Sequence, residues 1–356
     1  MTTYLLAGGG TAGHVNPLLA VADAIRAAEP DAVVLVLGTQ EGLEARLVPA
    51  RGYELVIVPR VPFPRRPNRQ ALRFLPRFTG AIALVTVVIR SRQVDVVVGF
   101  GGYVSTPAYL AARRAGVPIV VHEANARPGL ANKLGAWFTA HVGVAFPGTP
   151  IRHAHFVGMP LRSEIEHLDP AGSRPEALAF FGLSADRPTL LVTGGSLGAR
   201  RINATIVQSA GAFIDAGWQV LHITGEKAEV ADPGLEHYRM IAYCDRMDLA
   251  LAAADFVVSR AGSATVSELS ALGIPAVYAP YPVGNGEQRF NAAGVVEAGG
   301  GILVDDAAFL PDWVRRELVP LLADRARVRT MGAQAASVGV RDGSARMLEL
   351  IHRALA

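Results

Sequence analysis

Short apolar runs alternate with longer amphipathic stretches along most of the chain. The runs have the length and branched side chains of β-strands, and several are apolar at every position, as is typical of strands covered on both faces. The stretches between them repeat apolar residues with helical spacing. In the first half, the predicted strands are Tyr4–Ala7, Ala32–Leu37, Glu54–Val58, Val94–Val98, Pro118–Val121 and Val142–Ala145, and the predicted helices are Asn16–Ala28 and Ser105–Ala115.

The same rhythm starts again after Pro160. Strands that alternate with helices indicate parallel sheets with crossover helices. We therefore predict an α/β fold of two Rossmann-like, doubly wound parallel-sheet domains that face each other across a cleft. The predicted strands of the second half are Thr189–Thr193, Gln219–Ile223, Asp255–Ser259 and Ala276–Ala279, and the predicted helices are Ala199–Ala216 and Ser263–Leu272.

The length of 356 residues supports two domains, because about 150 residues per domain is usual. A linker is predicted around 157–165. We expect a first domain over 1–162 and a second over 163–340, with a C-terminal helix within 341–356 that packs back on the first. Ligands of open parallel sheets bind beyond the C-terminal ends of the strands, so the cleft is the expected site.

The composition indicates a globular protein, since 51% of residues are apolar and 18% are charged. The net charge of +3 is too small to indicate nucleic acid as a partner. The single cysteine, Cys244, excludes an internal disulfide. The N-terminus lacks the features of a secretory signal, and the longest apolar run, 80–89, is about half of the ~20 residues that a membrane span needs. We expect a cytoplasmic protein without a membrane span.

One segment departs from this even charge balance. Between Arg60 and Arg92 the chain has eight arginines and no lysine, aspartate or glutamate. Basic and apolar side chains that occur together are typical of a surface that docks on an anionic membrane. The alternative is a proline-broken loop with solvated arginines that leads to a buried helix at 80–89. The residues predicted to dock are Arg65, Arg66, Arg69, Arg73, Phe74, Leu75 and Phe78.

The sequence GGGTAGHVNP at 8–17 lies between the first predicted strand and helix. Its glycines let the backbone approach a ligand closely, and the N-terminus of the helix favours an anion. A nicotinamide site would need an acidic residue at the end of the second strand, which ends Gly38-Thr39 without one. His14 stands where the loop becomes helix. It is a candidate base that takes a proton from an attacking hydroxyl, or alternatively it bonds the loop or caps the helix.

Two further glycine clusters follow predicted strands. TGGSLGAR at 193–200 adds the hydroxyl of Ser196 to backbone N–H groups, which suits a pyrophosphate, or else it forms a tight turn. GFGGYVSTP at 99–107 is of the same kind, although its glycines alternatively make room for helix packing.

A carboxylate in the second half is a candidate ribose ligand. Glu268 lies in a predicted helix near Arg260, Ser263 and Thr265, and a carboxylate can accept two hydrogen bonds from a ribose diol. The alternative is a solvated helix residue. No motif predicts a metal site, a P-loop or a hydrolase nucleophile.

Together these motifs resemble the MurG family of peptidoglycan N-acetylglucosaminyltransferases, and they span most of the chain in the order of the family. A single loop would be unspecific, whereas eight in order are specific. The matching motifs are GGGTAGHVNP (8–17), GFGGYVSTP (99–107), HEANARPGLAN (122–132), GMPLR (158–162), GGSLGAR (194–200), YCDRM (243–247), SRAGSATVSE (259–268) and EQRFNA (287–292).

The resemblance implies a glycosyltransferase fold of the B type whose second domain holds most of the donor, UDP-N-acetylglucosamine. It implies two catalytic residues, His14 as the candidate base and Glu123 in a motif associated with the acceptor. The implied donor-binding residues are Thr11, Ala12, Gly13, Asn125, Arg162, Ser196, Cys244, Met247, Ala264, Thr265, Glu268, Gln288 and Asn291.

The implied reaction is inverting transfer of N-acetylglucosamine to the C4 hydroxyl of lipid I, which gives lipid II. The resemblance implies no cofactor and no essential metal, since backbone N–H groups would stabilise the leaving diphosphate. The implied partners are lipid I, anionic inner-leaflet lipids and other cell-wall and division proteins, at the cytoplasmic face of the membrane. The alternatives are a transferase with another lipid or natural-product acceptor, a non-catalytic nucleotide-sugar-binding subunit and an NAD-dependent oxidoreductase.

Overall fold

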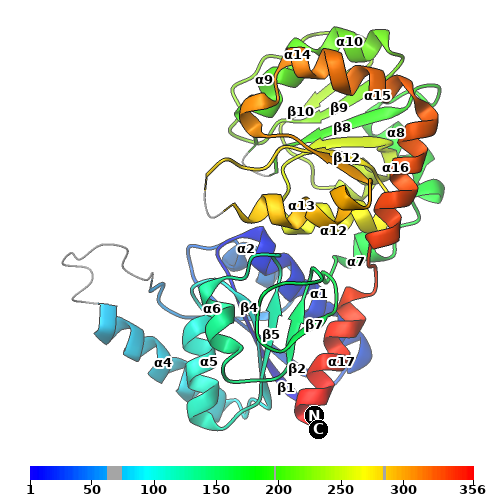
Figure 1. Ribbon diagram of the computed structural model, residues 1–356. Coiled ribbons are helices and arrows are strands. Elements are labelled where there is room, and N and C mark those ends of the chain that lie inside the picture. Colours follow the sequence, from blue (N-terminus) through cyan, green and yellow to red (C-terminus); the bar gives the residue numbers. More distant parts are fainter. Residues whose placement is uncertain (62–73, 196–197, 284–285) are drawn as a thin grey trace. The chain divides into compact units, whose positions relative to one another are not determined.

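The computed structural model describes residues 1–61, 74–195, 198–283 and 286–356, and it divides the chain into two compact units (Figure 1). Unit 1 comprises Met1–Ser163 together with Arg341–Ala356, and unit 2 comprises Glu164–Val340. Each unit contains its own parallel sheet. The predicted α/β fold with two Rossmann-like parallel-sheet domains is confirmed.

Among the described residues of unit 1, seven strands form a parallel sheet in the order β3-β2-β1-β4-β5-β6-β7. The order reverses between β1 and β4, so the loops after these two strands flank the place where open parallel sheets bind ligands. The strands are β1 (Thr3–Gly8), β2 (Val33–Gly38), β3 (Glu54–Ile57), β4 (Val96–Gly101), β5 (Ile119–Glu123), β6 (Val142–Val144) and β7 (Ala154–Phe156).

Helices cover both faces of this sheet. Because side chains alternate along a strand, Leu6 of β1 belongs to the core under α1 and α17, whereas Leu5 belongs to the core under α4 and α5. The C-terminal helix α17 therefore packs on unit 1. The helices of this unit are α1 (Ala12–Ala28), α2 (Glu44–Ala50), α4 (Phe74–Ser91), α5 (Ser105–Ala115), α6 (Leu130–Gly135) and α17 (Gly343–Leu355), and α7 (Ser163–Glu166) lies at the boundary between the units.

Among the described residues of unit 2, six strands form a second parallel sheet in the order β10-β9-β8-β11-β12-β13, which reverses between β8 and β11. The strands are β8 (Thr189–Thr193), β9 (Gln219–Ile223), β10 (Tyr238–Ile241), β11 (Phe256–Ser259), β12 (Ala276–Tyr278) and β13 (Gly301–Leu303). The principal helices are α8 (Pro170–Phe181), α9 (Arg200–Gln208), α10 (Ala210–Asp215), α11 (Met247–Ala253), α12 (Ser263–Leu272), α13 (Glu287–Glu297), α14 (Pro311–Trp313), α15 (Val319–Ala323) and α16 (Arg325–Val338).

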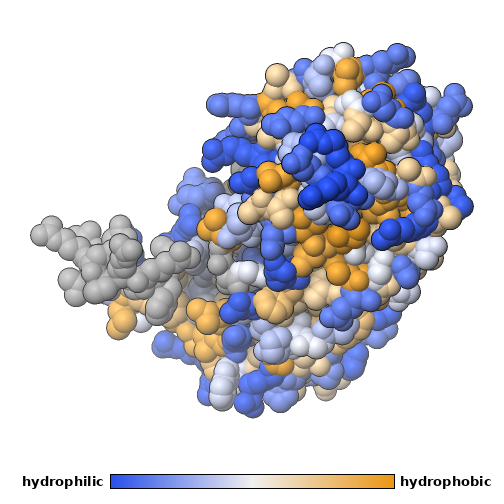
Figure 2. All heavy atoms as spheres, turned by 45° about the horizontal axis from the view of Figure 1, so that its top comes forward, coloured by the Kyte–Doolittle hydropathy of each residue, from blue (hydrophilic) through white to orange (hydrophobic). Residues whose placement is uncertain are grey.

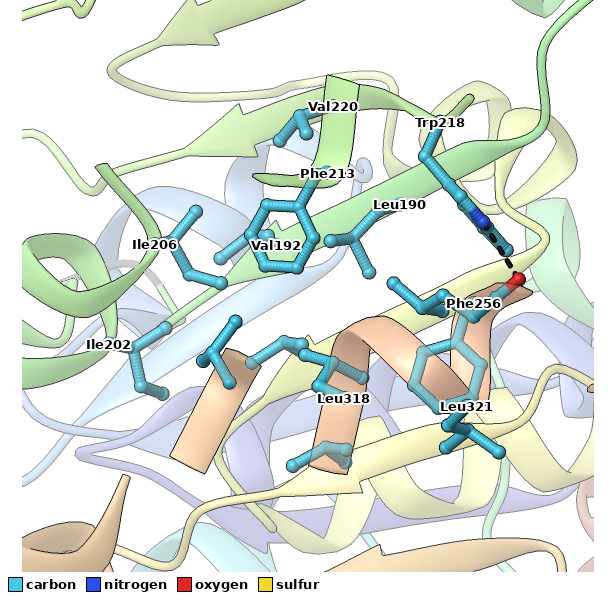
Figure 3. Close-up of a cluster of buried hydrophobic side chains, with 14 of the residues drawn as sticks. Leu190, Val192, Ile202, Ile206, Phe213, Trp218, Val220, Phe256, Leu318 and Leu321 are labelled. Atoms are coloured by element: carbon cyan, nitrogen blue, oxygen red, sulfur yellow. Dashed lines mark hydrogen bonds between the residues drawn. The ribbon is translucent and has the colours of Figure 1, made fainter. Parts of the chain in front are cut away.

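One core of unit 2 is built around the fully buried Trp218, just before β9 (Figure 3). Its indole N–H donates to the carbonyl of Leu322, at 2.9 Å, so the polar edge of the ring is satisfied. Phe213, Phe256 and Leu318 belong to the same cluster. This packing fixes the sheet near the start of β9, at the end opposite to the glycine loop that follows β8.

The structure corrects two predicted helices. The helix predicted over 199–216 is two helices, α9 and α10, which are separated at Ser209. The helix predicted to start at Asn16 starts at Ala12, so that His14 lies in its first turn.

Candidate active site

Two glycine loops of unit 1 are locked together at the C-terminal edge of its sheet. Gly102 has φ of +82°, and a Cβ at this position would lie 2.5 Å from the carbonyl oxygen of Gly9. The hydroxyl of Ser105 accepts the N–H of Gly101, at 3.0 Å, and lies 2.9 Å from the carbonyl oxygen of Ala7. Here glycine is required for the close approach of the two loops.

His14 faces both of these loops and is half-buried. Its Nδ1 lies 3.2 Å from the carbonyl oxygen of Gly9 and 3.3 Å from Oγ1 of Thr11. Because a carbonyl oxygen can only accept, a hydrogen bond to Gly9 requires a proton on Nδ1, and in the neutral ring the lone pair then lies on Nε2. A Cβ on Gly101 would lie 3.1 Å from Nε2. His14 therefore bonds the loop, and the same bond leaves Nε2 able to accept a proton.

Glu123, at the end of β5, organises the loop that follows it. The residue is 2% exposed. One carboxylate oxygen accepts the N–H of Asn125, and the other accepts the N–H of Gly129 and the side-chain amide of Asn132, each at 2.9 Å. These bonds fold the chain between β5 and α6 around a buried negative charge.

Asn132 extends this network into α5. Its amide nitrogen also donates to the carbonyl of His122, at 3.0 Å, and its oxygen accepts the hydroxyl of Tyr109, at 2.8 Å. Burial, and secondly the charge of Glu123, raise the pKa of Tyr109 well above its ordinary value, so the phenol remains a donor. A Cβ on Gly99 would lie 2.0 Å from this hydroxyl, so this glycine makes room for packing.

Glu44, on α2, is a buried carboxylate beside the first glycine loop that the sequence reasoning did not single out. It is fully buried and accepts the N–H of Gly10 (2.8 Å), and the N–H (2.9 Å) and hydroxyl (2.7 Å) of Thr39. Burial acts to raise the pKa of this carboxyl, but the hydrogen bonds outweigh it and hold the pKa below its usual value. A nicotinamide site would have an acidic residue at the end of the second strand, and Glu44 follows that strand six positions after Gly38. It binds the protein's own backbone.

Unit 2 contains a cavity of about 1240 Å³ at the C-terminal edge of its sheet. Of the predicted donor-binding residues, Thr265 and Gln288 line it, while Ser196 lies outside the described residues. Its charged lining is mainly basic and therefore suits an anion. The charged lining residues are Arg200, Arg201, Lys227, Arg260, Glu229 and Asp306.

A buried chain of hydrogen bonds supports the glycine loop of this cavity. Tyr238 bonds Nδ1 of His222, at 2.7 Å, and Nε2 of His222 bonds the amide oxygen of Asn203, at 3.1 Å. The amide nitrogen of Asn203 donates to the carbonyl of Thr224, at 2.8 Å. A Cβ on Gly198, where φ is +74°, would lie 2.2 Å from that carbonyl oxygen. The loop therefore rests directly on this network.

Arg260 lines the cavity and is held in place by hydrogen bonds. Its guanidinium donates to the carbonyls of Ala279 (3.0 Å) and Pro280 (3.1 Å) and to the carboxylate of Asp306 (2.6 Å). Arg201 bonds the other oxygen of Asp306, at 3.0 Å. One carboxylate thus joins two arginines of the lining.

The remaining predicted donor residues divide between the units. In unit 2, the amide of Asn291 is buried and donates to the carbonyl of Ala261, at 3.3 Å. The amide oxygen of Gln288 accepts the N–H of Tyr281, at 2.8 Å. Also in unit 2 are Cys244, Met247, Ala264 and Glu268, whereas Thr11, Ala12, Gly13, Asn125 and Arg162 belong to unit 1.

The predicted docking segment is described only from Phe74 onward. Helix α4 has 18 residues with a mean hydropathy of 1.4, so by length and composition it reaches the range of a membrane-spanning helix. Its Val85 and Ile89 are nevertheless buried in the core of unit 1. Arg65, Arg66, Arg69 and Arg73 lie outside the described residues. Within the described part of the chain, no group of three or more His, Cys, Asp or Glu side chains could hold a metal.

Both units match models of known families. Residues 4–144 match the glycosyltransferase family 28 N-terminal domain, and residues 189–347 match the family 28 C-terminal domain. Two similar proteins are each named a UDP-N-acetylglucosamine–N-acetylmuramyl-(pentapeptide) pyrophosphoryl-undecaprenol N-acetylglucosamine transferase. The one from Leifsonia xyli is 68% identical, over 100% of this chain and 99% of its own length. The one from Clavibacter sepedonicus is 63% identical, over 100% of this chain and 97% of its own length.

A solved structure, that of MurG from Acinetobacter baumannii, is also similar over both units. It is 25% identical, with a TM-score of 0.79, and the match covers 99% of this chain and 100% of that one.

Proposed function

The chain belongs to glycosyltransferase family 28, and from this premise we propose that it transfers N-acetylglucosamine from UDP-N-acetylglucosamine to lipid I. The acceptor atom is the C4 hydroxyl of the N-acetylmuramic acid unit, and the product is lipid II. The observation that carries the proposal is 68% identity over the whole chain to a relative named for this transfer. The resemblance to the MurG family that the motifs indicate is confirmed by the same relative.

The cavity of unit 2 is the proposed donor site. Backbone N–H groups of its glycine loop and the N-terminus of α9 would face the diphosphate, with Arg200 and Lys227 as nearby cations. Thr265 and Gln288 line the same space and would contact phosphate and sugar. The carboxylate of Glu268 would accept hydrogen bonds from both hydroxyls of the ribose.

The loops of unit 1 are the proposed site of the acceptor. Nε2 of His14 would take the proton of the C4 hydroxyl while the oxygen attacks the anomeric carbon. The bond from that carbon to UDP breaks, and UDP leaves with the electron pair from the opposite face, so the α-linked donor gives a β-1,4 link. Glu123 would shape the acceptor side through the loop that it organises, since Asn125, Gly129 and Asn132 already bond its carboxylate.

The negative charge that develops on UDP is the main electrostatic demand of this reaction. We propose that fixed N–H groups and the cations of the lining meet it, without an essential metal or cofactor. One preorganised donor of this kind is typically worth about 2.7–4 kcal/mol of barrier. The buried network under Gly198 supports this proposal, because it holds the loop in place before the charge develops.

Because lipid I is anchored in the membrane, unit 1 would dock on the anionic inner leaflet. Leu75 and Val87 of α4 are 68% and 64% exposed, although the other face of this helix is buried. Figure 2 shows that apolar side chains reach the surface of unit 1 on the side that carries α4. Trp137, just after α6, is 68% exposed and carries the guanidinium of Arg152 at 4.5 Å from its ring centre. This mixture of apolar and basic groups suits a lipid interface.

The direct test of the activity is incubation with radiolabelled UDP-N-acetylglucosamine and a lipid I analogue, with a diacylglycerol and nicotinamide cofactors as parallel arms. We expect label only in the lipid I arm. Label on diacylglycerol, or a change in nicotinamide absorbance, would establish one of the alternatives.

A further inference from the structure

The buried carboxylate of Glu44 is connected to His14 through a single peptide unit. Oε2 of Glu44 accepts the N–H of Gly10, at 2.8 Å, and the carbonyl of Gly9 faces Nδ1 of His14, at 3.2 Å. The N–H of Gly10 and the carbonyl of Gly9 belong to the same peptide bond. The groups thus form a continuous chain of carboxylate, peptide and imidazole, all within unit 1.

We propose that Glu44 is a positioning residue that acts through the Gly9–Gly10 peptide to fix the tautomer and orientation of His14. Its role in turnover rests on the proposed function, in which His14 is the base. Its role in selecting the tautomer does not.

The hydrogen-bond partners of Glu44 require its carboxylate to act as an acceptor. Three of the groups that bond the carboxylate are the N–H of Gly10 and the N–H and hydroxyl of Thr39, and each of them is a donor. An ionised carboxylate only accepts, so it satisfies all three. The peptide is thereby held with its carbonyl toward the imidazole, and hydrogen bonds in such a chain strengthen one another.

The tautomer follows from the same arrangement. The carbonyl of Gly9 needs a donor, so Nδ1 must carry the proton and Nε2 must keep its lone pair. Thr11 lies at a similar distance from Nδ1, 3.3 Å, but a hydroxyl both donates and accepts and therefore does not select a tautomer. The orientation of the peptide decides it, and Glu44 fixes that orientation.

The surrounding glycines show how closely the carboxylate is built into the loop. A Cβ on Gly9 would lie 2.5 Å from Oε1 of Glu44, and one on Gly42 would lie 2.1 Å from Oε2. Gly10 has φ of +90°, a conformation that other residues rarely adopt. The conformation of the loop therefore depends on glycine at these positions and on the position of the Glu44 carboxylate.

The test compares Glu44→Gln with Thr39→Val. The glutamine has the size of glutamate, but its NH₂ group must face one of the donors. The valine removes only the bond between the Thr39 hydroxyl and Glu44, at 2.7 Å, and leaves the bond to Gly10 intact. It is therefore the control for a general loss of stability around Glu44.

The readout is the tautomer of His14, measured by NMR of ¹⁵N-histidine-labelled protein at about pH 8.5, where an ordinary imidazole is neutral. The signal is identified by its loss in His14→Ala. We expect a protonated Nδ1 in the wild-type protein and in Thr39→Val, and a mixture of tautomers in Glu44→Gln. A protonated Nε2 in the wild-type protein would overturn the proposal, whether or not the variants fold. An unchanged spectrum in Glu44→Gln would also overturn it.

Turnover provides the second readout. We expect kcat of Glu44→Gln to fall by about 10- to 100-fold, the loss typical when an outer-shell partner that orients a metal-bound histidine is changed, with KM for the donor within about 2-fold of wild type. If the protein lacked the proposed transferase activity altogether, the NMR result would still decide the role of Glu44. Wild-type kcat in a folded Glu44→Gln would refute its part in turnover.

Discussion

The side-chain amide of Asn132 donates to the carboxylate of Glu123 at 2.9 Å, and its oxygen accepts the hydroxyl of Tyr109 at 2.8 Å. This one amide therefore connects helix α5, helix α6 and the end of strand β5. All three side chains are at most 2% exposed, so water cannot replace a lost bond.

Replacing Asn132 with leucine, which has a similar shape, should destabilise the fold strongly. Tyr109 and Glu123 would each keep a buried polar atom without this partner, and each such group costs about 1–3 kcal/mol. We expect the free energy of unfolding to drop by about 2–5 kcal/mol in urea titrations. The control is Lys133→Leu, an exposed position on the same helix. A change below about 0.5 kcal/mol in the Asn132 variant would contradict this account of the network.

The stability of unit 2 should depend on pH through His222. Burial lowers the pKa of this imidazole to about 4, while the unfolded chain has the ordinary value of about 6.5. Between these values the unfolded state binds more protons, so stability is complete above about pH 6.5 and falls as the pH decreases toward 4. Between about pH 7 and pH 5 the loss from this group is about 2 kcal/mol.

The measurement is urea unfolding at both pH values for the wild type and for His222→Gln, which does not titrate but can still form hydrogen bonds. The glutamine variant should lose less stability over this interval. An identical loss in both proteins would show that other groups cause it.

The basic lining of the proposed donor cavity should determine the affinity for UDP. Arg200→Gln and Lys227→Gln each remove a cation from the lining, and a hydrogen bond to a charged group is worth about 1.5–3 kcal/mol. Calorimetric titration should show Kd for UDP raised by about 10-fold or more in each. Arg239→Gln removes an exposed charge of unit 2 outside the lining and should leave Kd unchanged. An equal rise in Kd in all three variants would show that UDP responds to the overall charge of the protein and not to the cations of the lining.

The arginines at 65, 66, 69 and 73 should strengthen binding to anionic membranes. Each contributes about 1 kcal/mol near an anionic leaflet, so changing all four to glutamine should reduce cosedimentation with anionic vesicles by at least about 30-fold at low salt. The matched control replaces Arg315, Arg316, Arg327 and Arg329, which are exposed on unit 2. Undiminished binding of the first variant would count against docking by this segment.

The sequence predicted most of the strands, because burial on both faces leaves a continuous apolar run, but it missed β10 (Tyr238–Ile241), where Arg239 interrupts the run, and the three-residue β13 (Gly301–Leu303). It did not predict β7 (Ala154–Phe156), whose three residues are all exposed and carry no such pattern. It merged α9 and α10, because the apolar pattern continues through Ser209, where φ of −104° and ψ of 3° end the helix. The periodicity of apolar residues indicates which face of a helix is buried, but it does not indicate where the backbone changes direction.

Candidate site residues could be proposed from the sequence where a motif marks them. The glycine loops and His14 were proposed in this way, whereas Glu44 was not, because its partners, two backbone N–H groups and the hydroxyl of Thr39, form no sequence pattern. Glu123 was singled out by its motif. Only the structure shows that its carboxylate accepts hydrogen bonds from Asn125, Gly129 and Asn132.

The configuration of the product tests the central claim most directly. The wild-type protein would be incubated with a lipid I analogue and UDP-N-acetylglucosamine labelled with ¹³C at the anomeric carbon, in parallel reactions with and without a chelator. The one-bond carbon–proton coupling of the product then gives its configuration. We predict a β-1,4-linked disaccharide, formed at the same rate with and without the chelator. An α-linked product, or transfer that stops when divalent metal is removed, would contradict the account.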